Sequence, residues 1–229
     1  KRFSANVMAQ HFHYLFKKAG IAGASSHSMR RSFITNLATK GIGVRVLASI
    51  AGHRSIAVTQ RYIDVNDEMK RNALMLANTA RILKIPTVLT SSMEEYTQGP
   101  LLGELQTILP TAFAERVKRM GIVNAMDDEN FAAAVKATGR KKLVIAGVTN
   151  DVCTVYPTLT LVSQGFDVQV VADAGGSPTV VADDISLRRM ERAGATLTTT
   201  NQLIAELAGS WATPEGGELV QLIIGALQS

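Results

Sequence analysis

The first part of the chain carries hydrophobic residues at helical spacing and shows no strand pattern before about residue 85. Residues 5–19 predict an amphipathic helix, because apolar side chains recur there at every third or fourth position. A loop follows at residues 20–26, and glycines at positions 41 and 43 stop the next helix. We predict further helices in this part at residues 27–40, 44–51, 59–64 and 67–83.

After residue 85 the pattern changes to short apolar runs that alternate with amphipathic stretches. Residues 142–148 form a nearly continuous apolar run, which is typical of a buried parallel strand. We predict the other strands at residues 86–91, 166–173 and 195–199, and helices at residues 151–164, 183–193 and 201–208. This alternation predicts an α/β class: a short all-α N-terminal segment, then a doubly wound, Rossmann-like parallel sheet covered by helices.

The charge distribution divides the chain at about the same place. Residues 1–75 contain 12 Lys or Arg and 3 Asp or Glu, which gives a formal charge of +9. Residues 76–229 contain 12 Lys or Arg and 16 Asp or Glu, which gives a formal charge of −4. All four histidines lie in the first part, and the only cysteine lies in the second. Such asymmetry indicates two pieces of different origin, with a polyanion such as DNA as the expected partner of the first.

The composition also limits the kind of protein. A single cysteine excludes an internal disulfide and favours a cytoplasmic location. The longest apolar runs are far too short to cross a bilayer, so we expect no membrane partner. We expect neither a cofactor nor a bound metal.

Four residues of the basic part form a set suited to phosphodiester cleavage. His27 and Arg30 are three positions apart, which places them on one helix face, and His53 and Tyr62 follow. A guanidinium can hold phosphate oxygens, imidazoles can move protons, and a phenol can attack phosphorus. Each residue alone is far more often a surface or core residue, so the prediction depends on the ordered set.

The sequence around these residues resembles the C-terminal end of the tyrosine recombinases, the phage integrase family. The resemblance covers residues 1–74 and is carried by HSMRRSFITNL at 27–37, LASIAGHRSI at 47–56 and TQRYIDV at 59–65. It implies that Arg30 and His27 bind and protonate the scissile phosphate, that His53 assists, and that Tyr62 is the nucleophile. Arg30 and Arg54 would contact DNA phosphates. The family's first catalytic arginine and its hairpin lysine have no counterpart here, so we expect residual DNA affinity and little cleavage.

Cys153 is the candidate nucleophile of the second part. It follows a predicted strand and begins a predicted helix, and helix N-termini stabilise thiolates and offer free N–H groups to an oxyanion. The commoner fate of a lone cysteine is a buried, inert side chain, and position alone does not decide between the two.

The surrounding sequence looks like the isochorismatase-like cysteine hydrolases. The resemblance covers residues 75–229 and is carried by IPTVLTSS at 85–92, NAMDDENF at 124–131, LVIAGVTNDVCT at 143–154 and GFDVQVVADAGGS at 165–177. It implies hydrolysis of an amide-type small molecule through a covalent Cys153 intermediate, with backbone N–H groups of Thr149 and Cys153 near the oxyanion. Arg119 best matches the family's basic residue, with Lys118 as the adjacent alternative. The resemblance also implies a cis peptide bond between Val148 and Thr149, and a possible homo-oligomer.

The family's catalytic Asp has no match in this chain. By resemblance it ends a first strand that should precede the helix near residues 72–84, where recombinase-like sequence stands instead; Asp64 and Asp67 do not follow an apolar strand. Loss of a central strand would leave two strand edges bare, or make the strands at 86–91 and 142–148 pair directly. We therefore expect a fusion in which both sites are incomplete. The alternatives are an active hydrolase whose Asp comes from elsewhere, and a non-catalytic DNA-binding module.

Overall fold

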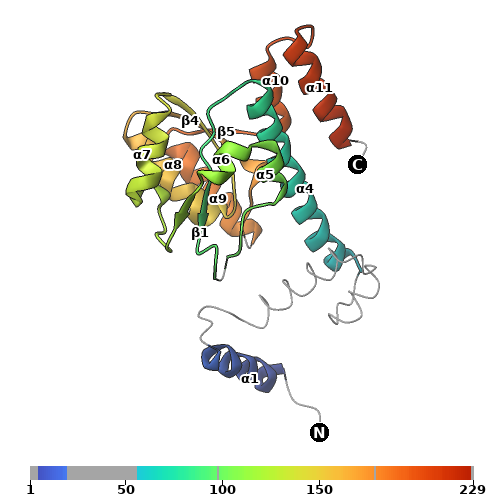
Figure 1. Cartoon of the computed structure of the whole chain (residues 1–229). Helices are drawn as coiled ribbons and strands as arrows, with labels where there is room; N and C mark the ends of the chain where they lie inside the picture. Colours follow the sequence, from blue (N-terminus) through green and yellow to red (C-terminus); the bar gives the residue numbers. More distant parts are fainter. Residues whose placement is uncertain (1–4, 20–55, 97, 178, 228–229) are drawn as a thin grey trace. The chain divides into compact units, whose positions relative to one another are not determined.

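The computed structural model describes residues 5–19, 56–96, 98–177 and 179–227 of the 229-residue chain (Figure 1). It divides into two compact units, Lys1–Asp67 and Glu68–Ser229. Helix α4 (Ile56–Ile82) contains the last residues of the first unit and the first residues of the second. The boundary predicted from the sequence, between residues 74 and 75, stays a prediction.

The first unit is described at α1 (Ala5–Lys18) and at the start of α4. Helix α1 confirms the predicted amphipathic helix, and Lys17 and Lys18 in its last turn interact favourably with the negative end of the helix dipole. The predicted helices at residues 27–40 and 44–51 lie outside the described residues.

In the described part of the second unit, five parallel strands form two sheets. In one sheet β1 (Thr90–Ser92) pairs with β2 (Val117–Arg119), and in the other the order is β3 (Lys142–Ile145), β4 (Asp167–Val171) and β5 (Thr196–Thr198). Parallel pairing requires crossover connections, and helices supply them.

Helices cover β4 on both faces, which is the doubly wound arrangement. Val168 and Val170 point into a core formed with α8 (Val155–Ser163) and α9 (Val180–Arg192). Val171 points the other way and packs with Leu203 of α10 (Thr200–Ala208) and Leu76 of α4. The α/β class predicted from the alternation of elements is therefore confirmed.

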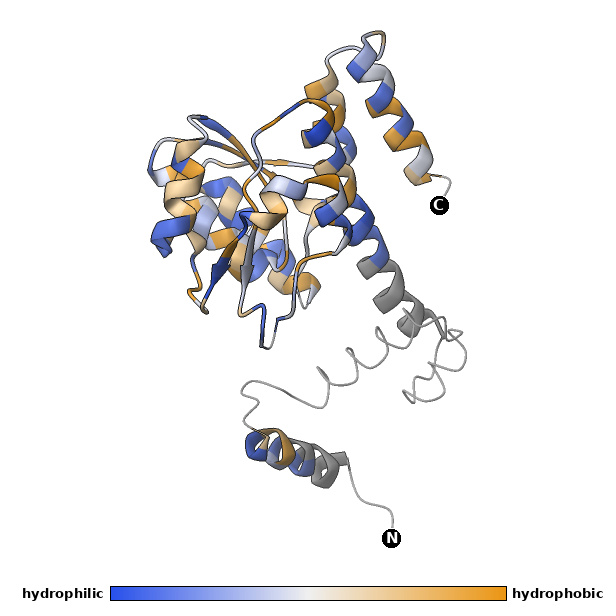
Figure 2. Cartoon of the chain, in the orientation of Figure 1, coloured by the Kyte–Doolittle hydropathy of each residue, from blue (hydrophilic) through white to orange (hydrophobic). Residues whose placement is uncertain are grey.

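Further helices complete the unit, and none of them was predicted from the sequence. These are α5 (Glu104–Ile108), α6 (Pro110–Ala114), the single turn η1 (Ala125–Asp127), α7 (Glu129–Ala137) and α11 (Pro214–Leu227). Hydrophobic and hydrophilic residues both occur along α11 (Figure 2), and its Leu219 is buried with Ile204 and Met75. No described helix is long and apolar enough to cross a membrane.

Several predicted boundaries were shifted, and hydrogen bonds account for the clearest case. Helix α9 begins at Val180 rather than at residue 183, because the Thr179 hydroxyl accepts from the N–H of Ala182 at 3.1 Å and caps the helix there. Strand β1 is confined to three residues, and β4 ends at Val171, where the single turn η3 (Ala172–Ala174) begins.

The two sheets remain separate in the described part of the chain: β1 pairs there only with β2, and β3 only with β4. Of the two outcomes expected from a missing central strand, the bare edges are the one observed. Val144 in β3 is 48% exposed, an unusual environment for a residue of an apolar parallel strand.

Candidate active site

Cys153 lies between β3 and α8, in a single π-helical turn formed by Asn150–Thr154 (η2). The predicted helix at residues 151–164 is thus a π turn followed by α8. The thiol is free and partly exposed. A partly exposed thiol at the start of a helix can meet a substrate, whereas the buried, inert alternative requires an enclosed side chain.

The chain enters this turn through a cis peptide bond between Val148 and Thr149, as the resemblance implied. The carbonyl oxygen of Thr149 accepts from the N–H of Thr154 at 3.1 Å, which closes the turn. The N–H of Asn150 donates to the carbonyl oxygen of Gly176 at 3.0 Å, and Val148 forms a parallel bridge with Gly176. The loop after β4 therefore supports the turn that carries Cys153.

A close backbone approach occurs beside this turn. A Cβ added to Gly175 would overlap the carbonyl oxygen of Gly147 and lie 2.6 Å from Oδ1 of Asn150. Both obstructing groups are held in place, since Gly147 is backbone and the Asn150 side chain is fully buried. Only glycine fits at position 175 in this arrangement.

Arg119 ends β2 and is buried. Its Nε donates to Oγ1 of Thr90 at 3.0 Å, and its Nη1 donates to the carbonyl oxygen of Ile122 at 2.6 Å. The Thr90 hydroxyl donates in turn to the carbonyl oxygen of Val117 at 2.8 Å, so its lone pair faces Arg119. The guanidinium is therefore fixed by Thr90 on β1 and by the backbone of Ile122, which follows β2.

Lys118, the alternative basic residue, has a different environment. Its side chain is about half exposed and reaches Glu94 at 3.5 Å and Glu95 at 3.4 Å. Glu94 is held mainly by Arg116, whose Nη2 lies 2.6 Å from Oε1, and by the Ser91 hydroxyl at 2.6 Å from Oε2. The hydrogen bond from Arg116 is the largest cause that lowers the pKa of Glu94 to about 2.

The side chains of the site predicted in the basic part lie outside the described residues. His27, Arg30, His53 and Arg54 lie outside the described residues. Tyr62 lies within α4, but its side chain is outside the described part. The roles of these residues stay predictions.

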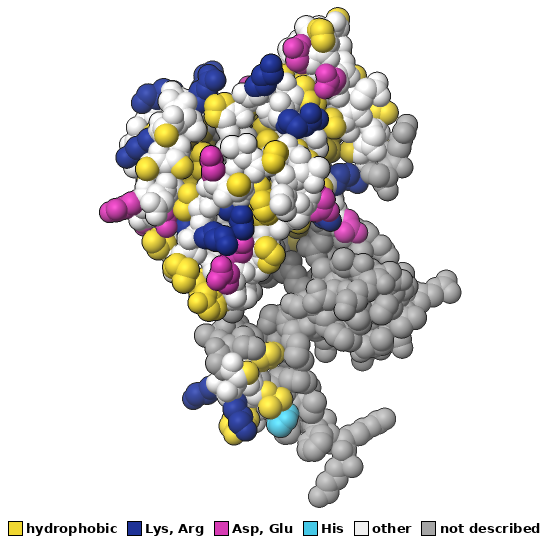
Figure 3. All heavy atoms as spheres, in the orientation of Figure 1, with side chains coloured by type: hydrophobic (Ala, Val, Ile, Leu, Met, Phe, Trp, Pro, Cys, Tyr) yellow, Lys and Arg dark blue, Asp and Glu magenta, His cyan; other side chains and the backbone are white. Residues whose placement is uncertain are grey.

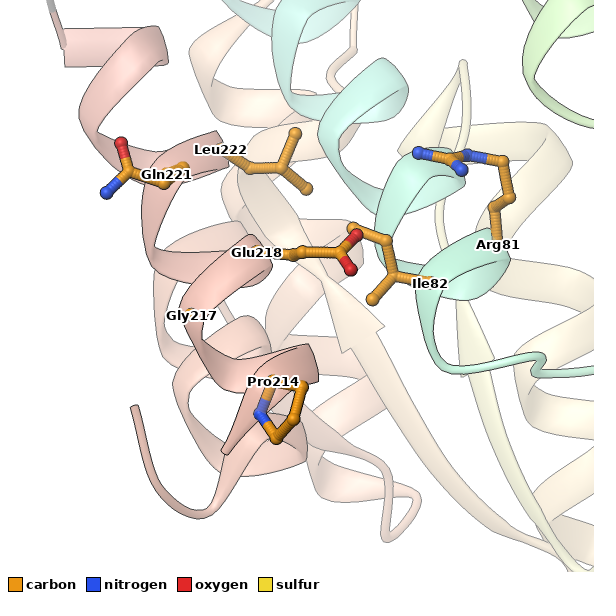
Figure 4. A pocket seen from close by; sticks show the side chains of 7 residues that line it. All are labelled: Arg81, Ile82, Pro214, Gly217, Glu218, Gln221 and Leu222. Carbon is orange, nitrogen blue, oxygen red and sulfur yellow. The ribbon is translucent and has the colours of Figure 1, made fainter. Parts of the chain in front are cut away.

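The second unit also has an open groove between the C-terminal end of α4 and α11, with a volume of about 520 Å³ (Figure 4). Ile82, Glu218 and Leu222 point into it. It is lined by Arg81, Ile82, Pro214, Gly217, Glu218, Gln221 and Leu222. No residue of the Cys153 turn lines this groove, so the groove is separate from the cysteine site. Across the described side chains, no cluster of three His, Cys, Asp or Glu is arranged to hold a metal.

A helix-covered parallel sheet with a free cysteine at the start of a helix defines an α/β protein with a candidate nucleophile. Comparison with known proteins gives the family. A sequence model of the isochorismatase domain matches residues 58–202, and one of the phage integrase family matches residues 1–69. The chain belongs to the isochorismatase family, and its N-terminal third is similar to the phage integrases.

Individual relatives agree with this assignment. The probable hydrolase YcaC of Escherichia coli is 41% identical over 145 residues, which cover 63% of this chain and 69% of the relative. A structure of E. coli YcaC, described as an octameric hydrolase of unknown specificity, covers 68% of this chain and 75% of its own with a TM-score of 0.64. YcaC from Pseudomonas aeruginosa, solved with hexane-2,5-diol and covalent acrylamide, is 40% identical to this chain. Its structure matches 71% of this chain and 84% of its own length, with a TM-score of 0.65.

Proposed function

We propose that Cys153 is the nucleophile of a hydrolase site in residues 68–229 and that Arg119 is its basic residue. The observation that carries this proposal is the position of the free, partly exposed thiol in the turn between β3 and α8. The thiolate attacks the carbonyl carbon of an amide, the amine leaves with a proton, and a thioester forms. Water then hydrolyses the thioester and regenerates the thiol.

The geometry favours Arg119 over Lys118 as the basic residue. Arg119 is buried and held by two hydrogen bonds, whereas Lys118 is half exposed beside two carboxylates. A preorganised cation loses less conformational entropy when it binds a developing negative charge. Lys118→Ala should therefore affect hydrolysis much less than Arg119→Lys does.

No described residue matches the family's catalytic Asp. The family's Asp would be carried by a strand beside β3, and the free edge of β3 has no partner strand there. We therefore propose that hydrolysis by the chain alone is slow, and that a useful rate requires a carboxylate from elsewhere, such as a neighbouring subunit. The octameric assembly described for E. coli YcaC supports self-association as a proposal, and light scattering tests it.

Thiol labelling tests the central proposal directly, because Cys153 is the only cysteine. Acrylamide adds to thiolates, and mass spectrometry counts the adducts. Rapid labelling at pH 6 would support an activated thiolate, and labelling only above pH 8 would contradict it. In parallel, hydrolysis of nicotinamide is measured with the unaltered protein and with Cys153→Ala. A useful rate that Cys153→Ala abolishes would refute the proposal that the site is incomplete.

A second function is favoured by the basic N-terminal part, where the integrase family model matches residues 1–69. We propose that this part binds DNA through phosphates, with Arg30 and Arg54 among the contacts, and that it does not complete strand cleavage by Tyr62. The binding constant should fall steeply as salt rises from 50 to 200 mM, on the order of the counterion effect known for basic proteins. Fluorescence anisotropy with duplex DNA measures this, and salt-independent or absent binding would remove the proposal.

We propose that the recombinase-like piece and the hydrolase-like piece are fused within one reading frame. One continuous read of the source DNA across codons 60–90 tests this point. An intact frame supports the fusion, and a break in that interval would separate the chain into two proteins.

A further inference from the structure

We propose that Asp183 is a positioning residue that holds the turn bearing Cys153 against the start of α9. The proposal rests on the proposed function in one respect only, namely that Cys153 reacts. Asp183 belongs to the first turn of α9, 30 residues beyond Cys153 in the sequence, and no part of the hydrolase resemblance described above assigned it a role.

One oxygen of Asp183 links two residues on separate segments. Its Oδ1 accepts from Nδ2 of Asn150 at 3.0 Å and from Oγ of Ser177 at 2.8 Å. Oγ of Ser177 also accepts from the backbone N–H of Asp151 at 3.1 Å. The first two residues of the Asn150–Thr154 turn are therefore both connected to Asp183, one directly and one through a hydroxyl.

The hydrogen bond from Asn150 to Asp183 matters for stability because the Asn150 side chain is buried away from water. The Asn150 side chain is fully buried, and its Oδ1 has no hydrogen-bond partner among the described residues. The bond to Asp183 is thus the only one that its side chain makes in that part of the chain. Removing this acceptor would leave a second buried polar atom of Asn150 unpaired, and the turn would have to shift to satisfy it.

The location of the carboxylate suits this task. Helix α9 begins at Val180 and Asp183 lies in its first turn, where the helix dipole and free N–H groups favour a negative side chain. Asp183 is thereby fixed by its own helix while it holds the turn. Because Cys153 comes two residues after Asp151 in the same turn, a shift of Asn150 and Asp151 moves the thiol relative to the N-terminus of α8.

The next residue supplies a matched control. Asp184 has the same side chain on the same helical turn, but it is 57% exposed and pairs only with Arg188 within the described region. Asp184→Ala removes the same charge from the same end of α9 without touching the Cys153 turn.

The test compares Asp183→Ala, Asp183→Asn and Asp184→Ala in the full chain by two readouts. The first is amide hydrogen exchange of a peptide covering residues 147–155, which requires no reactive thiol. We expect exchange there to rise about tenfold in Asp183→Ala, because the turn loses its hydrogen bond from Asn150 and Ser177 loses the acceptor that fixes its hydroxyl beside Asp151. Asp183→Asn keeps the acceptor oxygen, so amide exchange should rise less in this variant. In Asp184→Ala the exchange should match that of the unaltered protein.

The second readout is the ratio of acrylamide labelling rates at pH 6 and pH 8. A change in thiol exposure alters both rates alike, so the ratio of the rate at pH 6 to the rate at pH 8 reports how readily the thiol ionises. We expect this ratio to fall in Asp183→Ala and not in Asp184→Ala, because the thiol moves relative to the N-terminus of α8. Equal exchange in Asp183→Ala and Asp184→Ala would overturn the proposal. If the unaltered thiol labels only above pH 8 while Asp183→Ala still raises exchange, the positioning role stands and the proposed function falls. If Asp183→Ala does not fold, Ser177→Ala removes the link to Asp151 and decides by the same comparison.

Discussion

Glu94→Gln should lower the free energy of unfolding of the second unit by about 2 kcal/mol at pH 7. The Glu94 side chain is 9% exposed and joins the loop after β1 to Arg116, just before β2. Arg116 donates to both of its oxygens, at 2.6 and 2.9 Å, and the Ser91 hydroxyl donates at 2.6 Å. Such paired, charge-assisted hydrogen bonds are among the stronger polar interactions in proteins.

The magnitude follows from the pKa of the carboxyl. The hydrogen bond from Arg116, followed by that from Ser91, lowers the pKa of Glu94 from 4.5 to about 2. At about 1.4 kcal/mol per decade, this difference corresponds to roughly 3.5 kcal/mol, which we reduce to about 2 kcal/mol because the Glu94 and Arg116 side chains keep some exposure, 9% and 15%, and solvent screens the pair. A pKa lowered by folding means that the stabilisation is complete above pH 4.5 and is lost as the pH falls toward 2.

Urea unfolding at several pH values between 7 and 3 is the assay. The chain has one tryptophan, Trp211, which lies in the second unit, so its fluorescence together with far-UV circular dichroism follows that unit. Between pH 5 and 3 the unaltered protein should lose stability more steeply than Glu94→Gln does. Glu95→Gln is the control, because Glu95 is 74% exposed and contacts only Lys118 among described side chains. Equal losses for the two variants at pH 7, or parallel pH profiles, would refute the reasoning.

Two further substitutions test the packing around the site. Gly175→Ala should destabilise the second unit by at least about 1 kcal/mol and slow Cys153 labelling, because its Cβ would overlap the Gly147 carbonyl oxygen. Gly103→Ala, where a Cβ meets nothing within 4 Å, should leave both urea unfolding and labelling nearly unchanged, and equal effects would contradict the close approach. Met190→Ala should lower the free energy of unfolding in urea by about 2–5 kcal/mol, because Met190 of α9 is fully buried in the core that α8 and α9 form with β4. A loss below about 1 kcal/mol would show that neighbouring side chains move into the cavity left by the substitution.

The strands that could be predicted are those whose own residues favour a sheet. Strand β3 belongs to an apolar run and β4 is rich in valine, and both were found from the sequence within a few residues. Strand β2 was missed because two of its three residues are Lys118 and Arg119, and its extended conformation depends on pairing with β1. Helix α11 was missed because Gly216 and Gly217 weaken its first turns, and tertiary packing of Leu219 compensates for them.

The candidate site divides in the same way. The position of Cys153 follows from local sequence, since a strand, a tight segment and a helix are consecutive in the chain. Thr90 could not be identified, because its role arises only when β1 and β2 pair and bring its hydroxyl to Arg119. Asp183 could not be distinguished from Asp184 either. Both are Asp residues in α9, and only the tertiary structure shows that Asp183 faces the Cys153 turn whereas Asp184 pairs with Arg188. Local patterns locate a reactive group, whereas the groups that hold it come from the tertiary fold.

The environment of β3 connects the stability of the second unit with its chemistry. An apolar run such as residues 142–148 is typical of a strand buried on both faces with a neighbour on each side. Within the described residues, however, β3 is an edge strand, where Lys142 and Val144 are exposed and only Leu143 and Ile145 pack against the core. The sequence of β3 thus suits an interior position that the described chain does not supply. We propose that a parallel strand added at this edge would pair with β3 and bring its carboxyl end beside the Cys153 turn, so that one absent neighbour would account both for the bare edge of β3 and for the lack of a match to the family's Asp.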